Sequence, residues 1–160
     1  MARSASPHKL SASELLSLDH QLCFALYSSS LAMTKMYKPL LEPLGLTYPQ
    51  YLVMLVLWEH DAIPVSDIGT HLQLDSGTLT PLLKRLQANG LLRRERDKAD
   101  ERRVLLHLTA AGRALKARAA KVPPQVACAT GCDLDERLAL KQQLKKLRGQ
   151  LLSYSHPGTP

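Results

Sequence analysis

One cysteine near the start of the chain shares a helical pattern with several of the five tyrosines. Cys23 precedes Tyr27 by four residues, so their side chains lie on one face of a helix if this segment is helical. Tyr37 and Tyr48 lie fourteen and twenty-five positions after the cysteine. The first question is whether Cys23 is a small packing residue or a reactive thiol.

Phenolic hydroxyl groups favour the reactive form of a thiol. The thiolate is the nucleophile, and two phenols that donate hydrogen bonds to sulfur stabilise S⁻. Their rings also line a pocket suited to an organic peroxide. At ~1.5 Å per residue, Tyr37 lies about 21 Å along the helix from Cys23 and cannot reach it within one chain. In a two-fold dimer with antiparallel first helices, Tyr37 of the partner subunit could reach it, followed by Tyr48 of the partner subunit.

Composition describes a basic globular protein. The 160 residues, 45% of them apolar, suffice for one domain with a real core. The formal net charge of +7 favours an anionic partner, nucleic acid first, although charge alone leaves the partner open. The polar start, residues 1–9, does not fit a signal peptide, and the longest apolar run, Tyr51–Trp58, is too short for a bilayer. We therefore expect a cytoplasmic protein with no membrane partner.

The three cysteines are too few and too scattered for a secreted disulfide framework. In a reducing cytosol a disulfide is transient, catalytic or redox-sensing. Cys128 and Cys132 form a CxxxC pair, which also allows an intrasubunit disulfide or half of a metal site. Because no histidine or carboxylate cluster completes a zinc ligand set, we expect no metal and no other cofactor.

The N-terminal part of the chain predicts two helices. Apolar residues at helical spacing indicate one helix from about Ser13 to near Lys38, where Pro39 ends or kinks it. Thr47 then resembles the first residue of a capping box, with a glutamine three positions later and a proline in the first turn. The helix that follows, through Trp58, is apolar nearly all round, so we expect it to be buried.

The middle of the chain has the pattern of a helix-turn-helix. Residues 65–72 predict a short helix, residues 73–75 a tight turn, and residues 76–89 a second helix closed by an Asn-Gly pair. Pro81 fits this second helix poorly. Either the regular helix starts late, near Thr80, or it is kinked at the proline.

Two strands around a charged turn follow, as in the wing of a winged helix-turn-helix. Residues 91–94 pair with residues 104–108 around a tip at about 97–102. From Lys84 to Arg103 there are eight Lys or Arg against four acids, a balance that suits contact with a phosphate backbone. The alternative is a solvated charged hairpin. The order of helix-turn-helix and wing favours DNA.

The candidate DNA-binding side chains are short hydroxyl donors on the second helix and guanidinium groups on that helix and the wing. They are Ser76, Thr78, Thr80, Arg85, Arg94, Arg96 and Arg102. Arg102 stands at the wing tip, from which an arginine can enter a narrow minor groove.

The C-terminal part predicts further helices. Thr109 caps one through about Lys121, a pair of prolines interrupts it, and Asp133 or Asp135 opens a last amphipathic helix. Helices at both ends of a small winged core leave apolar surface that one subunit cannot cover, so a helical homodimer interface is expected.

The expected fold is mostly α with a small β wing, in a dimeric winged helix-turn-helix architecture. Its regions are a flexible N-terminal arm at 1–12, a helical dimerisation region at 13–46 and 109–152, a winged helix-turn-helix DNA-binding region at 47–108, and a C-terminal tail at 153–160.

The wing sequence resembles that of the MarR family of dimeric winged-helix regulators. DERRVLLHLTAAG matches the D-x-R…LT..G signature of that family with Asp100, Arg102, Leu108, Thr109 and Gly112. The resemblance covers residues 15–152. It implies that Arg102 probes the minor groove and that the second helix of the helix-turn-helix lies in the major groove.

A longer stretch is similar to the organic hydroperoxide-sensing branch of that family, the OhrR repressors. LDHQLCFALYSSSLAMTKMYKPLLEPLGLTYPQY and SGTLTPLLKRL carry this similarity. It implies that Cys23 is the peroxidatic thiol, hydrogen-bonded by Tyr37 and Tyr48 of the partner subunit. Tyr27, one helical turn after Cys23, shares its face of the helix and can cover the thiol. The similarity further implies the two-cysteine type, in which Cys128 attacks the Cys23 sulfenic acid across the dimer. The additional Cys132 has no assigned role.

The resemblance implies a redox-sensing repressor and not an enzyme. The reduced homodimer would bind a palindromic double-stranded operator and release it after an organic hydroperoxide oxidises Cys23 and a disulfide forms with Cys128. Three alternatives remain: a MarR-type repressor that senses a small aromatic ligand and has inert cysteines, a thiol peroxidase, and a non-specific architectural DNA binder. The pattern lacks the alternating strands and helices of a peroxidase fold, and Cys23→Ser would leave a ligand sensor inducible.

Overall fold

The computed structural model describes residues 11–155, and the chain divides into two compact units, Met1–Leu115 and Lys116–Pro160. Most of the described residues are helical, and their strands all lie in the first unit, which confirms a mostly α fold with a small β wing. Residues 1–10 of the expected arm lie outside the described residues. Ser11 and Ala12, its last two positions, are the cap and first residue of a helix.

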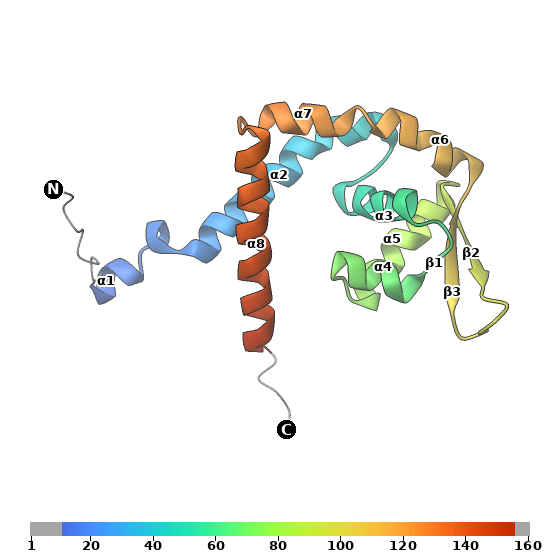
Figure 1. Ribbon diagram of the computed structural model, residues 1–160, viewed down its shortest axis with the longest axis horizontal. Helices are drawn as coiled ribbons and strands as arrows, with labels where there is room; N and C mark the ends of the chain where they lie inside the picture. The colour runs from blue at the N-terminus through green and yellow to red at the C-terminus, as the bar shows by residue number, and fades with distance from the viewer. Residues whose placement is uncertain (1–10, 156–160) are drawn as a thin grey trace, which may run out of the picture. The chain divides into compact units, whose positions relative to one another are not determined.

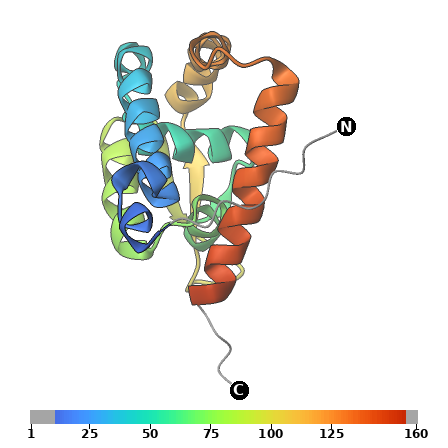
Figure 2. The ribbon, with the colours of Figure 1, turned by 90° about the vertical axis from the view of Figure 1, so that its left-hand side faces the viewer.

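The expected single helix from about Ser13 is interrupted, so that prediction is wrong in its first third. In its place are two short elements and one long helix: α1 (Ala12–Leu15), the 3-10 helix η1 (Leu18–His20) and α2 (Leu22–Leu41), with changes of direction between them (Figures 1 and 2). The Ser17 hydroxyl donates to the Glu14 carbonyl and is hydrogen-bonded to the His20 ring. Such local bonds give the backbone an alternative to continuing the helix.

Helix α2 ends later than the proline pattern indicates. Pro39 lies inside the helix, which continues to Leu41, so of the two expected effects of this proline the end of the helix is excluded. A proline removes the one hydrogen bond that its own N–H would donate within the helix. Only two helical residues follow Pro39, so little of the helix lies beyond the lost bond. The side chain of Leu41 is fully buried.

Helix α3 (Tyr48–Glu59) follows the short 3-10 helix η2 (Glu42–Leu44) and confirms the expected capping box. The backbone N–H of Thr47 donates to the Gln50 side chain at 2.9 Å, while the Thr47 hydroxyl accepts from the backbone of the same turn. As expected for a helix that is apolar nearly all round, Val53, Met54 and Leu57 are buried.

Within residues 11–155 no single helix is long and apolar enough to cross a membrane. One pair passes the same test of length and composition together, Leu22–Leu44 with Tyr48–Glu59, and the two parts are bent by 66°.

The helix-turn-helix has the expected bounds. Helix α4 (Val65–Leu72) buries Ile68 completely and Leu72 only in part, and α5 (Ser76–Ala88) buries Leu79, Leu83 and Leu86. Gln73, in the left-handed conformation at φ 55°, reverses the chain between them. Because α5 begins at Ser76 and contains Pro81, the alternative of a late start near Thr80 is excluded.

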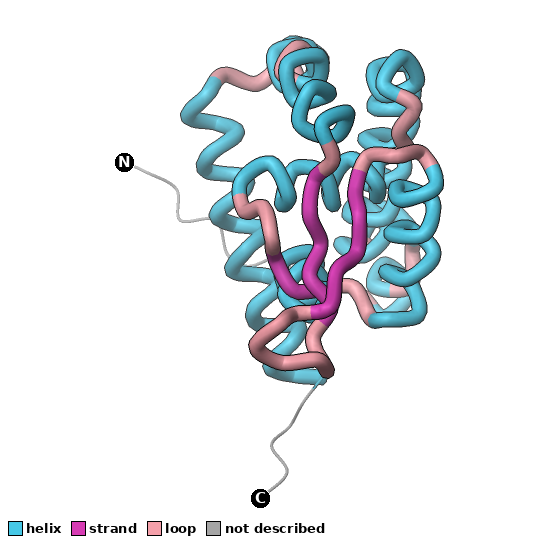
Figure 3. The backbone as a smooth tube through the Cα atoms, turned by 90° about the vertical axis from the view of Figure 1, so that its right-hand side faces the viewer, coloured by secondary structure: helices cyan, strands magenta, loops and turns pink. Residues whose placement is uncertain are grey.

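The wing is a hairpin of β2 (Leu92–Arg96) and β3 (Val104–Leu108), drawn in magenta in Figure 3. Leu92 pairs with Leu108 and Arg96 with Val104, so β2 is two residues longer at its far end than expected. A third strand, β1 (Ile63–Pro64), pairs with β3 and gives the order β1-β3-β2. A strand of two residues is too short to show an alternating apolar pattern, so the sequence did not indicate β1.

Three helices complete the described residues: α6 (Ala110–Ala119), α7 (Val122–Ala129) and α8 (Leu134–Ser155). The Thr109 cap is confirmed, because its hydroxyl accepts from the Gly112 N–H at 3.0 Å. The expected end at Lys121 is two residues too late, since Pro123 and Pro124 lie in the first turn of α7. A proline is well tolerated there because the N–H groups of a first turn have no helical partner.

Asp133, rather than Asp135, opens the last helix. Its carboxylate accepts from the Glu136 N–H at 2.9 Å, and the Glu136 carboxylate accepts from the Asp133 N–H at 3.0 Å. Helix α8 ends at Ser155, so the first three residues of the expected tail at 153–160 are helical. Residues 156–160 lie outside the described part of the chain.

Candidate functional site

Three tyrosine rings gather where the C-terminal half of α2 meets the first turn of α3. The ring centroids of Tyr37 and Tyr48 lie 4.5 Å apart, and those of Tyr37 and Tyr51 lie 5.9 Å apart. We call these three residues the phenol cluster. Two of them are sequence candidates, whereas Tyr51 was missed, although its position three residues after Tyr48 on a helix places both on one face.

Burial changes the acidity of the phenol cluster. Desolvation, followed by the charges of Tyr48 and Tyr51, raises the pKa of Tyr37 to about 12. Burial also raises the pKa of Tyr48 and of Tyr51 above the ordinary value. The three hydroxyl groups are therefore protonated at neutral pH and are available as hydrogen-bond donors.

Cys23 lies at the opposite end of α2, in its first turn. Its side chain is exposed, and Sγ donates a hydrogen bond to the Gln21 side-chain carbonyl at 3.6 Å. Tyr27 is 61% exposed one helical turn further on. The fourteen residues from Cys23 to Tyr37 span about 21 Å of helix at ~1.5 Å each, so one chain does not bring the thiol to the phenol cluster.

A groove of about 760 Å³ borders the phenol cluster. It lies between the second half of α2, η2 and the start of α3, and Tyr48 forms part of its wall. Leu31, Leu46 and Pro49 contribute apolar surface, while Lys35 and Lys38 contribute positive charge. We call this the α2 groove. Neither lysine is among the sequence candidates, although their positions on either side of Tyr37 place them near the phenol cluster.

The other two cysteines lie in the second unit. Cys128 is exposed in the last turn of α7, and Cys132 is partly buried, with its Sγ donating to the Thr130 carbonyl at 3.4 Å. All three thiols are free. Among residues 11–155 no group of three or more His, Cys, Asp or Glu side chains is arranged to hold a metal ion.

The first turn of α5 presents the short donors expected of a DNA-reading helix. The Asp75 carboxylate caps the turn by accepting from the Thr78 N–H at 2.8 Å and from the Thr78 hydroxyl at 2.9 Å. These hydrogen bonds hold the pKa of Asp75 below its ordinary value. The Thr78 hydroxyl is therefore engaged in the cap, while Ser76 and Thr80 are exposed.

The wing tip is shaped by Asp100. Its carboxylate accepts from the Arg102 N–H at 3.1 Å and its carbonyl from the Arg103 N–H at 2.9 Å, while the Arg103 carbonyl accepts from the Asp97 N–H. These bonds close a tight turn and leave the Arg102 side chain exposed at the tip. The two residues of the D-x-R signature thus differ in their contacts. Asp100 accepts the hydrogen bonds that form the turn, and the Arg102 side chain is exposed on that turn.

Arg94 lines a small pocket between the start of α4, helix α5 and the wing. The pocket has a volume of about 280 Å³, and its lining includes Thr80, Arg94, Arg102 and Arg103. Arg94 Nε and Nη2 are buried and have no hydrogen-bond partner. We call this the arginine pocket. A cavity lined by three arginine residues suits an anionic group.

The seven DNA-binding candidates are thus only partly brought together. Thr80, Arg94 and Arg102 line the arginine pocket. Arg85 is exposed in the second half of α5, and Arg96 is exposed at the end of β2 nearest the wing tip.

Comparison with known proteins identifies the family. A family model described as transcriptional regulator SarA/Rot matches residues 35–119, more than half of the chain. The regulator TtmR of Methylorubrum extorquens is 53% identical over 84% of this chain and 69% of its own length. The organic hydroperoxide resistance transcriptional regulator of Bacillus subtilis is 55% identical over 68% of this chain and 74% of its own length.

Solved structures of similar proteins support the same family. The crystal structure of AbfR from Staphylococcus epidermidis is 34% identical, with a TM-score of 0.73 over 88% of this chain and 97% of that one. The chain therefore belongs to the MarR-like SarA/Rot family of winged-helix transcriptional regulators, and it is a regulator rather than an enzyme. The expected similarity to the organic hydroperoxide regulators is confirmed by the Bacillus subtilis relative.

Proposed function

We propose that this chain is a redox-sensing repressor that binds a palindromic double-stranded operator as a reduced homodimer and releases it when an organic hydroperoxide oxidises Cys23. The observation that carries the proposal is the separation within one chain of an exposed thiol from a cluster of protonated phenols. A second copy of the chain, related by a two-fold axis, places each thiol against the phenol cluster of its neighbour.

Apolar surface on α1, η1 and α2 supports a dimer. Leu16 is 86% exposed, and Leu15, Leu18 and Leu22 are each more than half exposed. Burying a leucine side chain contributes about 1.5–3 kcal/mol, so a second copy that covers these positions gains substantial free energy. Leu134, Leu138 and Leu140 add exposed apolar surface on α8.

The α2 groove suits both the approach of the thiol and the binding of the oxidant. Tyr48 offers a protonated hydroxyl at its wall, and Lys35 and Lys38 offer positive charge, all of which favour a thiolate at this place. The apolar lining favours the organic part of a hydroperoxide.

The oxidation proceeds in two balanced steps. The Cys23 thiolate attacks the terminal oxygen of ROOH, the O–O bond breaks, and the leaving alkoxide takes a proton to become ROH, which leaves Cys23 as a sulfenic acid. The Cys128 thiol of the other subunit then attacks this sulfur, the S–O bond breaks, and water leaves as the disulfide forms. Because the new bond joins α2 of one subunit to α7 of the other, the two α5 helices lose the spacing that matches the half-sites.

The relatives support this assignment through what their names state. The Bacillus subtilis relative is an organic hydroperoxide resistance regulator. AbfR has been solved in a reduced form bound to DNA, 36% identical to this chain, and in a disulfide form, 38% identical.

Operator binding before and after treatment with cumene hydroperoxide tests the proposal. We expect the reduced protein to bind, the oxidised protein to release, and a linked dimer to appear on non-reducing gels. Cys23→Ser should stay bound, Cys128→Ser should give no linked dimer, and Cys132→Ser serves as the matched control, with release and linkage retained. Release by Cys23→Ser under peroxide would contradict the proposal.

The arginine pocket favours a second candidate function, a repressor that senses a small aromatic carboxylate. Arg94 has two buried, unpartnered nitrogen donors and lines this pocket together with Thr80 of α5. A carboxylate bound at this place competes with the DNA backbone. Benzoate that releases DNA equally from the wild-type protein and from Cys23→Ser, but not from Arg94→Met, would support this function instead.

A further inference from the structure

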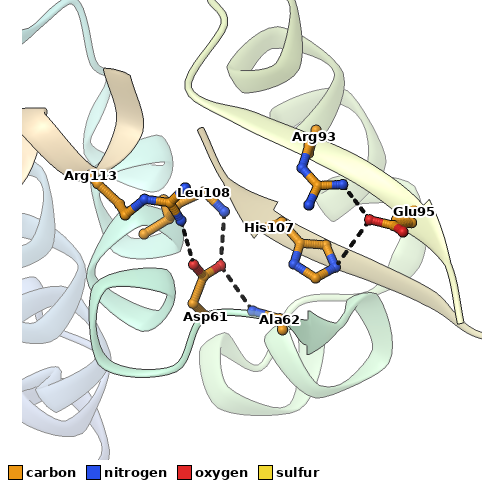
Figure 4. Close-up of polar contacts among 7 residues, drawn as sticks. All are labelled: Asp61, Ala62, Arg93, Glu95, His107, Leu108 and Arg113. Atoms are coloured by element: carbon orange, nitrogen blue, oxygen red, sulfur yellow. Dashed lines mark hydrogen bonds and ion pairs between the residues drawn. The ribbon is translucent and has the colours of Figure 1, made fainter. Parts of the chain in front are cut away.

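Asp61 joins three parts of the first unit through one carboxylate (Figure 4). It follows α3 and precedes β1. Oδ1 accepts from the backbone N–H of Leu108 at 2.8 Å and from that of Ala62 at 2.9 Å. Oδ2 accepts from Arg113 Nη1 of α6 at 2.8 Å. The end of the wing strand β3 and the first turns of α6 are therefore tied to the same side chain.

The carboxylate replaces a missing part of the sheet. Ile63 pairs with Leu106 in antiparallel register, so a longer β1 would place residue 61 opposite Leu108. Ala62 lies in the left-handed region at φ 61°, which is not a strand conformation, and β1 begins only at Ile63. The Leu108 N–H accordingly bonds to the Asp61 side chain instead of to a strand carbonyl. This turn conformation is unfavourable for alanine, and the Asp61 bond to the Ala62 N–H helps to hold it.

Helix α6 is fixed to the base of the wing next to this carboxylate. The Thr109 hydroxyl donates to the Gly90 carbonyl at 2.6 Å, and Trp58 Nε1 donates to the Gly112 carbonyl at 2.9 Å. Gly112 packs so closely that an added Cβ would lie 2.0 Å from the Leu91 carbonyl oxygen. Arg113, one residue further along α6, adds the ion pair with Asp61.

The ionisation of Asp61 suits this role. Burial acts against the charged carboxylate, but the hydrogen bonds from Leu108 and Ala62, with the positive charge of Arg113, hold the pKa of Asp61 below its ordinary value. The Asp61–Arg113 pair is therefore charged at neutral pH.

A second acidic group on the same sheet makes no such connection. Glu95 of β2 is paired with Arg93 and lies 3.7 Å from His107 Nε2, and all three residues belong to the wing hairpin (Figure 4). Within the described residues, Glu95 and Asp61 thus offer a matched comparison of an ion pair inside the wing with one that leaves it.

We propose that Asp61 is a positioning residue that couples the wing to α6. A displacement of α6 then moves the wing relative to the bound DNA. Helix α6 runs across the boundary between the first and second units, at Leu115. The inference rests on the proposed redox function, in which a disulfide at α7 displaces the helices that follow the wing.

The test measures the operator Kd of the peroxide-oxidised protein and that of the reduced protein. The ratio of the oxidised Kd to the reduced Kd is then compared between variants. Asp61→Asn and Arg113→Gln should each lower this ratio by about five-fold or more, because they weaken the coupling between the oxidised helices and the wing. Arg113→Lys, which keeps the charge, should restore part of the ratio. Glu95→Gln should leave the ratio unchanged.

The outcomes separate two failures. If the wild-type protein releases DNA on oxidation and both Asp61→Asn and Arg113→Gln keep the wild-type ratio, the role of Asp61 is disproved and the redox function stands. If the wild-type protein does not release DNA, the proposed function fails and this inference falls with it. Arg113→Gln retains the Leu108 and Ala62 bonds of Asp61, so its ratio stays informative if Asp61→Asn unfolds. Thermal unfolding of each variant checks that the fold is retained.

Discussion

Tyr37 is the side chain on which most of the proposed sensing chemistry depends. Its ring contacts both other members of the phenol cluster, and its hydroxyl is protonated across the physiological range. A hydrogen bond to a charged acceptor contributes about 1.5–3 kcal/mol, which is about ten-fold or more in the population of a thiolate. In the proposed mechanism the hydroxyl of Tyr37, rather than its ring, bears on the reactivity of the thiol.

Tyr37→Phe should slow the oxidation of Cys23 by about ten-fold, because it removes one proposed donor to the thiolate of the partner subunit and leaves the ring in place. Loss of the free thiol under cumene hydroperoxide, followed by a thiol-reactive dye, measures the rate. Tyr154→Phe is the matched control, since Tyr154 is 87% exposed on α8. Equal rates for wild type and Tyr37→Phe would remove this hydroxyl from the mechanism.

The acidity of Tyr37 makes stability depend on alkaline pH. Its pKa is about 12 in the folded chain and about 10 when unfolded, so the unfolded chain loses the phenolic proton first. The free energy of unfolding should therefore be unaffected below about pH 10 and fall as the pH rises toward 12. Urea unfolding at several alkaline pH values measures the slope, which should be shallower in Tyr37→Phe. An identical slope in that variant would contradict the assignment.

At the level of the elements, local signals in the sequence located most helix starts. Thr47, Thr109 and Asp133 all cap helices as their spacing indicates, because capping needs only residues within one turn. Elements that depend on distant partners were not predictable. Strand β1 exists because β3 lies beside it, and the Asp61 carboxylate completes it from a position with no local pattern.

In the candidate site, too, the features within one element were predictable and those between elements were not. The spacing of Cys23, Tyr37 and Tyr48 was readable from the sequence because one helix and one turn carry it. The α2 groove with Lys35 and Lys38, and the two buried, unpartnered guanidinium nitrogen atoms of Arg94, depend on how separate elements pack. Sequence periodicity describes a face of one element and not its neighbour.

The Asp75 cap should set the stability of α5. Asp75→Ala removes the acceptor for the Thr78 N–H and hydroxyl, and we expect it to lower the free energy of unfolding by about 1 kcal/mol. Urea unfolding at neutral pH measures the change. Asp75→Asn keeps an acceptor at the cap and should cost much less, so an equal loss in both variants would point to charge rather than to capping.

Two glycines allow a matched test of the close approach between α6 and the wing. Gly112→Ala should lower the free energy of unfolding by about 2–3 kcal/mol, because its Cβ would meet the Leu91 backbone. Gly149→Ala, on α8 with no atom within 4 Å of the added Cβ, should raise it by up to about 1 kcal/mol through helix propensity. Chemical unfolding of the two variants should therefore shift in opposite directions.

At the level of the whole molecule, the proposed sensor requires two chains. Each copy carries its thiol at one end of α2 and its phenol cluster at the other. A symmetric pair completes two equivalent centres, and each disulfide would link one copy to the other. In this proposal DNA release and the oligomeric state are coupled, because a chain that stays monomeric would have neither a complete peroxide site nor two recognition helices.

Leu22→Glu tests this requirement. Leu22 is 61% exposed in the first turn of α2, so the substitution should leave the fold of one chain intact but place a charge where the proposed partner packs. We expect sedimentation to show a monomer, operator affinity to fall by more than about ten-fold, and Cys23 oxidation to slow, since the monomer keeps the thiol but loses the partner's phenols. Gln125→Glu adds the same charge at an exposed polar position of α7 and should remain dimeric. A monomeric Leu22→Glu protein whose Cys23 reacts as fast as in the wild type would show that the thiol needs no second chain.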